Sequence, residues 1–215
     1  MFTHLNVFED FRPKISAKHA LSPYVFLGNI HPKLQLEVLK QTNKTKLIGC
    51  DTMNLWIDTE KKELLKVLKA VDVLVVNDSE ARQLAKEANL LTASKKILRL
   101  MKKKPNRIPP VLIVKKGEHG LLMLQGKKFF SLPAYPLEKV LDPTGAGDSF
   151  AGGFFGHLAK TKDLSWDNFK KACAYGTITA SFCVEQFGTK ALENITFSKV
   201  QKRYIKFKDL TNFHF

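Results

Sequence analysis

The sequence predicts an α/β fold of three layers, in which helices cover both faces of a mostly parallel sheet. Short apolar runs alternate regularly with helical patterns from residue 24 onward, as in strand–helix–strand units. The runs are compact and end in turn residues, as buried strands do. A chain of 215 residues, 44% of them hydrophobic and 26% charged, is also long enough to bury one sizeable core.

The first half of the chain predicts three strands with helices between them. Pro32 opens the first of these helices, because its fixed φ suits the first helical position. The strands are expected at residues 24–29, 46–51 and 72–77, and the helices start at Pro32, near Leu64 and after Asn77.

The second half predicts further strands and then long helices. Residues 116–120 contain two glycines between apolar runs, which indicates a turn. In chain order we expect a basic helix at 93–104, a loop at 106–110, strands at 111–115, at 121–124 and through Phe129, helices from Ala146, at 164–184 and at 197–204, and a loose tail after Lys208.

One stretch, residues 141–153, combines a proline and four glycines just before an apolar helical pattern. Pro143 fixes its own φ, while Gly145 and Gly147 permit backbone angles that other residues avoid. Their small size leaves backbone N–H groups bare at the expected start of a helix. The helix dipole there points the same way as the unpaired N–H groups, so the sequence predicts an anion site.

Asp148 lies in this predicted anion site and has two interpretations. A first-turn acid is favoured by the helix dipole, and this structural role alone explains its presence. Alternatively, Asp148 accepts a proton from a hydroxyl group while the N–H groups hold a phosphoryl group beside it. A loose phosphoryl-transfer transition state asks little of its base beyond position, so a weakly basic carboxylate is adequate.

The stretch is neither a Walker loop nor a dinucleotide fingerprint, because it has no lysine and its third glycine comes too late. It closely resembles the C-terminal signature of the ribokinase-like (PfkB-type) carbohydrate kinases, Asp-Thr-x-Gly-Ala-Gly-Asp followed by a small, apolar helix. The resemblance implies that Asp148 is the catalytic base. The implied anion hole is the backbone of Gly145, Ala146 and Gly147.

Asn77 and Glu80 form a second motif, at the end of a predicted strand. Their spacing is that of a helix cap, with a polar residue followed by Glu in the first turn. The family has Asn-x-x-Glu at this place, near the nucleotide phosphates and their magnesium. Because the glycine stretch occurs in the same chain, we favour the functional role near the phosphates. Capping and this functional role can hold at once.

The resemblance also implies nucleotide contacts at two turns. A strand followed by x-Gly-x-x-Gly borders the nucleotide in the family, which makes Lys115 and Gly117 candidates. The end of the last long helix and the turn after it border the adenine, which points to Thr177 and Gly188.

The same region often holds a monovalent cation in the family, and hard cations require oxygen ligands. Asp142 and Thr144 are the candidates here, together with backbone carbonyls near Val184 and Gly188. The cofactors implied by the resemblance are therefore ATP and Mg²⁺, with K⁺ as a further candidate.

Ligands of parallel sheets sit outside the carboxyl ends of the strands. Asn29 and Asp51 follow two predicted strands and are assigned to the acceptor side. The spacing from Asp51 to Asn54 departs from the commoner Asp-x-Asn at this strand end, so the roles of these residues stay open.

The resemblance covers the later two thirds of the usual family protein, from Tyr24 to the closing helix. We therefore expect an N-terminally truncated fold. Residues 1–24 would be a remnant of the lid and acceptor region, with a short strand at residues 3–8, and residues 25–207 would form the nucleotide-binding and catalytic domain. Residues 208–215 would be a loose tail. Apolar strand edges left without neighbours favour association, which leaves a homodimer open.

These features predict an ATP-dependent kinase acting on a hydroxyl group of a sugar or nucleoside. An inactive nucleotide-binding remnant and a basic nucleic-acid-binding protein are the alternatives. The net charge of +15 favours the last of these, but the lysine clusters are short, scattered and not interleaved with aromatic residues.

The sequence also predicts a cytoplasmic protein. No apolar stretch is long enough to span a bilayer, and the first residues lack the pattern of a signal peptide. The three cysteines are odd in number and have no metal-binding spacing, which favours reduced thiols.

Overall fold

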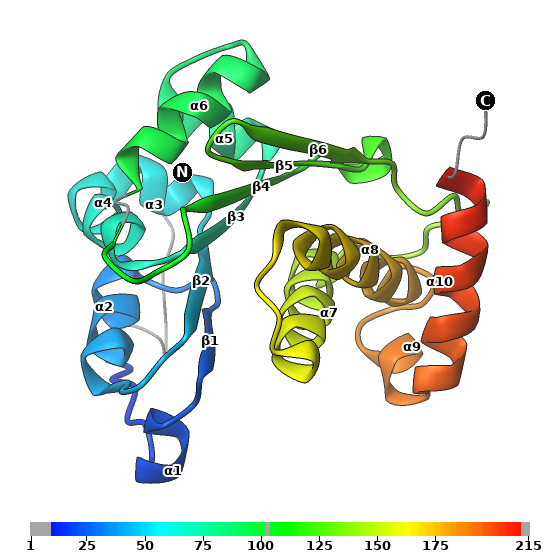
Figure 1. Ribbon diagram of the computed structural model, residues 1–215, viewed down its shortest axis with the longest axis horizontal. Coiled ribbons are helices and arrows are strands. Elements are labelled where there is room, and N and C mark those ends of the chain that lie inside the picture. Colours follow the sequence, from blue (N-terminus) through cyan, green and yellow to red (C-terminus); the bar gives the residue numbers. More distant parts are fainter. Residues whose placement is uncertain (1–9, 102–103, 212–215) are drawn as a thin grey trace.

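The computed structural model describes residues 10–101 and 104–211 and has one six-stranded sheet between two layers of helices (Figure 1). Each strand lies beside its predecessor in the chain. The first four strands are parallel, and the last two are antiparallel. The strands are β1 (Tyr24–Leu27), β2 (Leu47–Asp51), β3 (Val73–Asn77), β4 (Val111–Lys115), β5 (Leu121–Gln125) and β6 (Lys128–Leu132).

The helices divide between the two faces according to their place in the chain (Figure 1). Parallel crossovers are right-handed, so strands added in one direction put their connecting helices on one face. These are α2 (Pro32–Gln41), α3 (Asn54–Thr59), α4 (Lys61–Ala70), α5 (Asp78–Ala85) and α6 (Leu90–Leu100). The other face is covered by the helices that follow β6, which are α7 (Ala146–Thr161), α8 (Trp166–Cys183), α9 (Lys190–Glu193) and α10 (Phe197–Thr211).

Each face of the sheet has its own core, because alternate residues of a strand point to opposite faces. Val73 and Val75 of β3 belong to the core shared with α7, α8 and α10, whereas Leu74 and Val76 belong to the core under α4, α5 and α6. All four side chains are at most 1% exposed. Strands that are buried on both faces consist of consecutive apolar residues, which is why these strands could be predicted from the sequence.

Helices α7 and α8 pack closely through glycines. A Cβ atom on Gly153 would lie 2.5 Å from Thr179 Oγ1 and 2.8 Å from the Tyr175 carbonyl oxygen. On Gly176 it would lie 2.8 Å from the Phe150 carbonyl oxygen. Side chains at these positions would force the backbones apart, so the glycines fix how the start of α7 sits relative to the end of α8.

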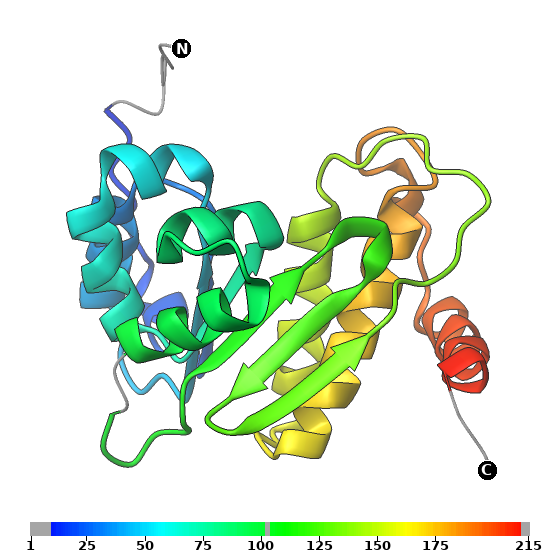
Figure 2. The same cartoon turned by 90° about the horizontal axis from the view of Figure 1, so that it is seen from above.

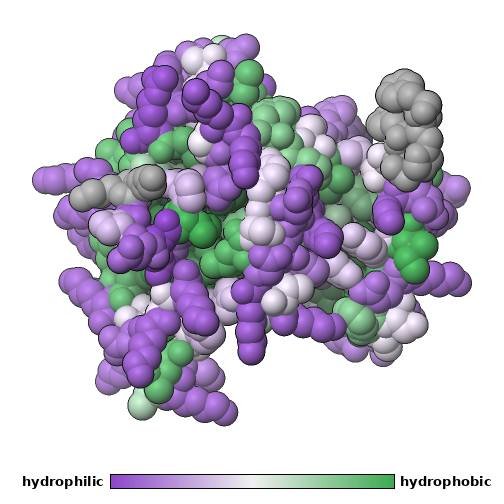
Figure 3. Space-filling view, in the orientation of Figure 1, coloured by the Kyte–Doolittle hydropathy of each residue, from purple (hydrophilic) through white to green (hydrophobic). Residues whose placement is uncertain are grey.

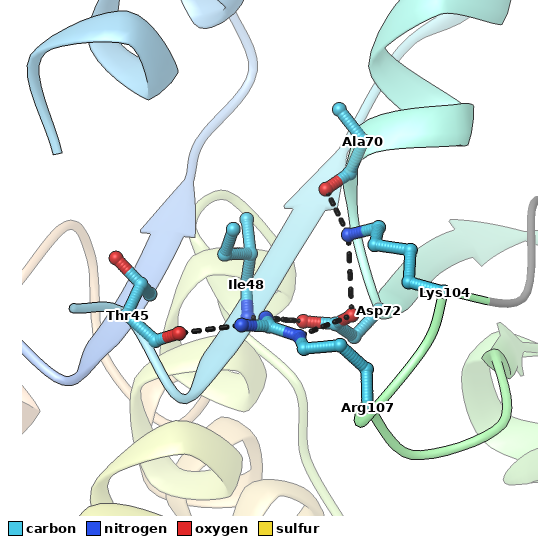
Figure 4. Close-up of polar contacts among 6 residues, drawn as sticks. All are labelled: Thr45, Ile48, Ala70, Asp72, Lys104 and Arg107. Atoms are coloured by element: carbon cyan, nitrogen blue, oxygen red, sulfur yellow. Dashed lines mark hydrogen bonds and ion pairs between the residues drawn. The ribbon is translucent and has the colours of Figure 1, made fainter. Parts of the chain in front are cut away.

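A buried ion network ties together the amino-terminal ends of the central strands (Figure 4). Asp72, which is 2% exposed, accepts hydrogen bonds from the Ile48 N–H at 2.9 Å and from Arg107 Nε at 3.1 Å. Lys104 Nζ lies 3.2 Å from the same carboxylate. Paired and hydrogen-bonded in this way, the buried charge holds the segment before β4 against the sheet. The two cations also donate to the carbonyl oxygens of Thr45 and Ala70.

A long segment without regular secondary structure, residues 133–145, joins β6 to α7 (Figure 2). It runs outward from the sheet and then returns to the start of α7. On the way out, the Tyr135 ring packs 5.7 Å from the Phe207 ring of α10. On the return, the Leu141 N–H donates to the Val184 carbonyl at 2.8 Å, which anchors the segment to the end of α8.

The predicted order of the strands and longer helices is confirmed, and the differences lie in short helices and at element ends. The sequence analysis does not predict the short helices α3 and α9. Helix α6 begins at Leu90 rather than Ala93, because Asn89 Oδ1 caps the Thr92 N–H at 3.0 Å.

The terminal segments differ more from expectation. Residues 17–20 of the segment expected to be irregular form one helical turn, α1 (Ala17–Ala20). Helix α10 continues to Thr211, so the expectation of a loose tail is wrong for residues 208–211. The strand predicted at residues 3–8 lies outside the described residues.

Candidate active site

Three of the predicted site residues end neighbouring strands. Asp51 ends β2, Asn77 ends β3 and Lys115 ends β4. Asn77 and Lys115 are direct partners in the parallel register, while Asp51 is level with Val75 on β3. Because the carboxyl ends of parallel strands meet at one edge, these residues share the edge where ligands bind in such sheets.

The glycine turn leads directly into α7, as the sequence predicts. Gly145 precedes the helix with φ +77°, in the left-handed region that favours glycine. The Ala146 N–H is already bonded to the Pro143 carbonyl at 3.2 Å, so it is not free for an anion as the sequence analysis expected.

Other N–H groups at the start of α7 remain available. Ser149 is the first residue of the helix whose N–H bonds to the carbonyl four residues earlier, that of Gly145, at 2.9 Å. The N–H groups of Gly145, Gly147 and Asp148 make no hydrogen bond among residues 10–101 and 104–211. They lie at the positive end of the helix dipole, which makes this end of α7 a local anion site.

Lys115 reaches this turn from the end of β4. Its Nζ lies 2.7 Å from the position that a Cβ atom on Gly147 would occupy. The side chain is half-buried, and within the described part of the chain its ammonium group has no hydrogen bond or ion pair. A half-buried cation that makes no hydrogen bond or ion pair with the described residues therefore stands beside the bare N–H groups.

The Asp51 carboxyl group is buried on the same edge. Asp51 is 9% exposed, and its Oδ1 has no hydrogen-bond partner among the described residues. The pKa of Asp51 is raised from an ordinary value of 3.8 to about 7. Burial is the largest cause, the charges of Asp148 and Glu80 act in the same direction, and the Lys115 ammonium opposes them. These four side chains, from β2, α5, β4 and α7, are thus close enough to influence one another electrostatically.

Asn77 and Glu80 form the capping box that their spacing predicts. Asn77 Oδ1 accepts the Glu80 N–H at 2.7 Å, and Glu80 Oε2 accepts the Asn77 N–H at 2.8 Å. Burial raises the pKa of Glu80, while the Asn77 hydrogen bond and Lys115 lower it. The structural role is confirmed, and the half-buried carboxylate also lies near Lys115.

Asp142 clamps the return of the long segment onto the turn after α8. Its carboxylate accepts the Thr144 N–H at 2.9 Å and the Gly188 N–H at 3.1 Å. These bonds, that to Thr144 first, hold the pKa of Asp142 below its usual range. The carboxylate therefore fixes the shape of the backbone that leads into the glycine turn.

The remaining predicted residues are less closely connected to the charged side chains at the strand ends. Asn29 Oδ1 accepts a hydrogen bond from Trp56 Nε1 at 3.0 Å, which links the end of β1 to α3. Gly117 and Gly188 have φ values of +57° and +61° and form exposed turns. Thr177 is half-buried on α8, and no described contact ties it to the strand ends.

The sequence analysis missed Gln35, which organises the strand ends. Gln35 is 2% exposed on α2. Its Nε2 lies 3.0 Å from the Gly28 carbonyl oxygen and 3.2 Å from that of Asp51. It therefore holds the ends of β1 and β2 together and fixes the backbone of Asp51. A polar residue among apolar helix positions was the available signal.

The described residues contain no group of three or more His, Cys, Asp or Glu side chains placed to hold a metal ion. Mg²⁺ is commonly bound by one or two carboxylates together with substrate phosphates and water. The unpartnered Asp51 oxygen and the half-buried Glu80 fit a divalent metal that arrives with phosphates.

Hydrophilic residues are spread over the visible face and are interrupted by apolar ones, rather than gathered in one strip (Figure 3). Two cavities, of about 210 and 390 Å³, share Glu185 at the end of α8 and lie away from the strand ends. In the part of the chain that the structure covers, no helix is both long and apolar enough to cross a bilayer.

Comparison with known protein families matches residues 20–195 to the pfkB family carbohydrate kinases. The chain is 30% identical to a nucleoside kinase of Methanocaldococcus jannaschii over 85% of this chain and 55% of that protein. It is 28% identical to adenosine kinase of Saccharomyces cerevisiae over 65% of this chain and 41% of that one. It thus spans about half the length of these relatives.

Solved structures show the same fold. The crystal structure of the Methanocaldococcus jannaschii nucleoside kinase matches 94% of this chain and 60% of its own, with 26% identity and a TM-score of 0.71. The ribokinase of Thermotoga maritima matches 86% of this chain and 57% of its own, with 25% identity and a TM-score of 0.65.

Proposed function

Because this chain belongs to the pfkB family of carbohydrate kinases, we propose that it transfers the γ-phosphoryl group of ATP to a hydroxyl group of a sugar or nucleoside. The acceptor class follows the relatives, which are named as nucleoside kinases and ribokinases. All three cysteines are free and buried, which agrees with a reducing compartment, and we place the activity in the cytoplasm.

One observation carries the proposal. The unpaired N–H groups at the start of α7 and the Lys115 ammonium group meet at Gly147, and Asp148 follows in the same helical turn. Such a site holds phosphoryl oxygens through N–H dipoles and a cation, and puts a carboxylate beside them.

In this proposal Asp148 accepts the proton of the acceptor hydroxyl as the hydroxyl oxygen bonds to the γ-phosphorus. The bond from that phosphorus to the bridging oxygen breaks, and ADP leaves with that oxygen. The N–H groups of Gly145, Gly147 and Asp148, rather than that of Ala146, form the anion hole for the transferred group. Positioning and charge stabilisation contribute most to such a reaction, because its transition state is loose.

The other site residues take supporting roles. Bound ATP supplies the phosphoryl group, and a divalent metal, proposed to be Mg²⁺, neutralises phosphate charge. Glu80 and Asn77 would hold the metal–phosphate side from the start of α5, and Asn29 and Asp51 the acceptor side. Residues Gly117, Thr177 and Gly188 are proposed to border the nucleotide.

An assay of Asp148→Asn tests this assignment against a matched helix-start acid. Asp167 lies in the first turn of α8 and pairs with Lys170 at 2.6 Å, so Asp167→Asn removes a first-turn carboxylate far from the proposed chemistry. The substrates are Mg-ATP with a panel of pentoses, hexoses and nucleosides. Asp148→Asn should lower kcat by about 10²–10⁴-fold with little change in ATP binding. Asp167→Asn should behave as the wild type.

Three outcomes separate the alternatives. Near-full turnover by Asp148→Asn would make Asp148 a helix-start acid only. ATP binding by the wild type without transfer to any acceptor would favour a nucleotide-binding remnant. Binding of DNA or RNA that weakens steeply with salt, without ATP binding, would favour the nucleic-acid alternative.

A further inference from the structure

The turn around Asp142 is poorly suited to the monovalent cation that the sequence analysis assigns to it. Both carboxylate oxygens of Asp142 accept backbone N–H groups, from Thr144 at 2.9 Å and from Gly188 at 3.1 Å. The Val184 carbonyl oxygen accepts the Leu141 N–H at 2.8 Å. Each of these oxygens therefore already accepts one donor, and the N–H groups hold it in place without a cation.

The Thr144 carbonyl oxygen, which lies close to the glycine turn, also accepts a hydrogen-bond donor. It accepts the Cys183 thiol at a sulfur–oxygen distance of 3.5 Å, and Cys183 is 2% exposed. The oxygens expected to surround K⁺ are therefore used to hold the segment before α7 against the end of α8. A bound K⁺ would have to share these oxygens with the donors that they already accept.

A fixed positive charge is nevertheless present on the other side of the glycine turn. Lys115 comes from β4, and its Nζ stands at the open side of Gly147. Most other partly buried cations of the described chain form an ion pair or a hydrogen bond, as Lys104 and Arg107 do with Asp72. Among residues 10–101 and 104–211 Lys115 makes no hydrogen bond or ion pair, and its charge acts on Asp51 and Glu80, so its N–H groups remain available to a ligand.

The surrounding acids make a cation necessary for anion binding. Asp51, Glu80 and Asp148 lie near Lys115, and three carboxyl groups would repel phosphate oxygens if nothing opposed them. The N–H groups of α7 supply only partial charges. The positive charge of Lys115 therefore decides whether this edge of the sheet attracts or repels phosphate.

We propose that Lys115 is the built-in cation of the phosphoryl-binding turn and that phosphate binds there without a monovalent cation. The proposal rests on the proposed function, since it names the group that holds the transferred phosphoryl oxygens. It assigns Lys115 a direct contact with those oxygens, through a charge-assisted hydrogen bond from Nζ.

Calorimetric titration of the whole chain tests the proposal, with Mg-ATP and with inorganic tripolyphosphate as separate probes. Each titration is run in potassium chloride and in tetramethylammonium chloride of equal ionic strength. The variants are Lys115→Gln, Lys115→Arg and, as a matched control, Lys116→Gln, which removes the next lysine along the chain. Circular dichroism melting establishes that each variant is folded.

The wild type should bind both probes with less than about twofold difference between the two salts. Lys115→Gln should weaken both by about tenfold or more, as expected for one charge-assisted hydrogen bond. Lys115→Arg should retain most of the affinity and Lys116→Gln nearly all of it. If Lys115→Gln unfolds, the wild type and Lys115→Arg can still be compared in the two salts. That comparison tests the prediction that binding does not depend on potassium.

Equal binding by Lys115→Gln and Lys116→Gln overturns the proposal, as does a tenfold gain of wild-type affinity in potassium. Normal ATP turnover by Lys115→Gln would leave the kinase function standing and remove this inference. Lys115-dependent binding of tripolyphosphate without phosphoryl transfer would support the inference and remove the kinase function. If neither probe binds the wild type, both are wrong.

Discussion

Substituting Gly153 with alanine tests how tightly α7, which follows the glycine turn, is held to α8. The new Cβ atom would lie 2.5 Å from Thr179 Oγ1 and 2.8 Å from the Tyr175 carbonyl oxygen. Thr179 cannot simply rotate away without cost, because its hydroxyl donates to Tyr175 O at 2.9 Å. The Tyr175 oxygen belongs to the backbone, so α8 itself has to shift.

Two effects of opposite sign set the expected change in stability. Overpacking of this kind costs about 1–3 kcal/mol. Alanine stabilises a helix interior by about 0.5–1 kcal/mol relative to glycine. The free energy of unfolding should therefore fall by about 1 kcal/mol, and by about 2.5 kcal/mol at most. For a chain of this size, roughly 1 kcal/mol corresponds to a Tm change of about 2–4 °C.

Gly156 provides the control, because it lies in the same helix and an added Cβ there meets nothing within 4 Å. Gly156→Ala should therefore raise the free energy of unfolding by about 0.5–1 kcal/mol. Urea and thermal unfolding of the two variants measure the contrast, which should be about 1–3 kcal/mol, because both variants gain the same helix propensity and only Gly153→Ala is overpacked. If Gly153→Ala proves as stable as Gly156→Ala, the helices are not in the close contact described.

Three further predictions concern the acids. Glu80→Gln keeps an acceptor for the Asn77 N–H but loses its charge, so it should raise the magnesium concentration needed for half-maximal activity with little change in Tm; an unchanged requirement would leave capping as its sole role. Asp72→Asn leaves two partly buried cations without their counter-charge and should cost about 3–5 kcal/mol in urea unfolding; a loss under about 1 kcal/mol would contradict this. The Asp51 pKa is raised in the folded state from 3.8 to about 7, so its stabilising contribution is complete below about pH 4 and is lost as the pH rises to about 7. Asp51→Asn should flatten the dependence of the urea midpoint on pH in that window, and an unchanged slope would show that Asp51 is not the group responsible.

Much of this fold was predictable because its strands are buried on both faces. Val73 to Val76 read as a continuous apolar run, and such a run marks a strand whatever its neighbours are. The glycine turn was predictable for a similar reason, since Gly145 occupies a left-handed conformation that few other residues adopt. These features depend on local chemistry, which sequence patterns record.

What the sequence did not reveal depends on contacts between distant residues. Lys115 and Gly147 are 32 positions apart, and their contact follows only once β4 and α7 are placed in space. Gln35 links β1 to β2 through main-chain carbonyls, which leave no mark on residue type. The use of the Asp142 oxygens by N–H groups is likewise invisible in sequence, so a carboxylate that reads as a cation ligand can be a backbone clamp.

The sequential order of the strands has a consequence for how the chain is made on the ribosome. Each of the first four strands can pair with its predecessor as soon as it emerges, because no later strand has to be inserted between them. The sheet face that contains Val75 and Ile113 is covered later, because Phe154 and Phe169, which pack against it, belong to α7 and α8. At roughly 5–20 residues per second, the stretch from Lys115 to the end of α8 takes about 3–14 s to synthesise. For those seconds a broad apolar sheet face is open to other nascent chains, and folding factors that bind such surfaces would act then.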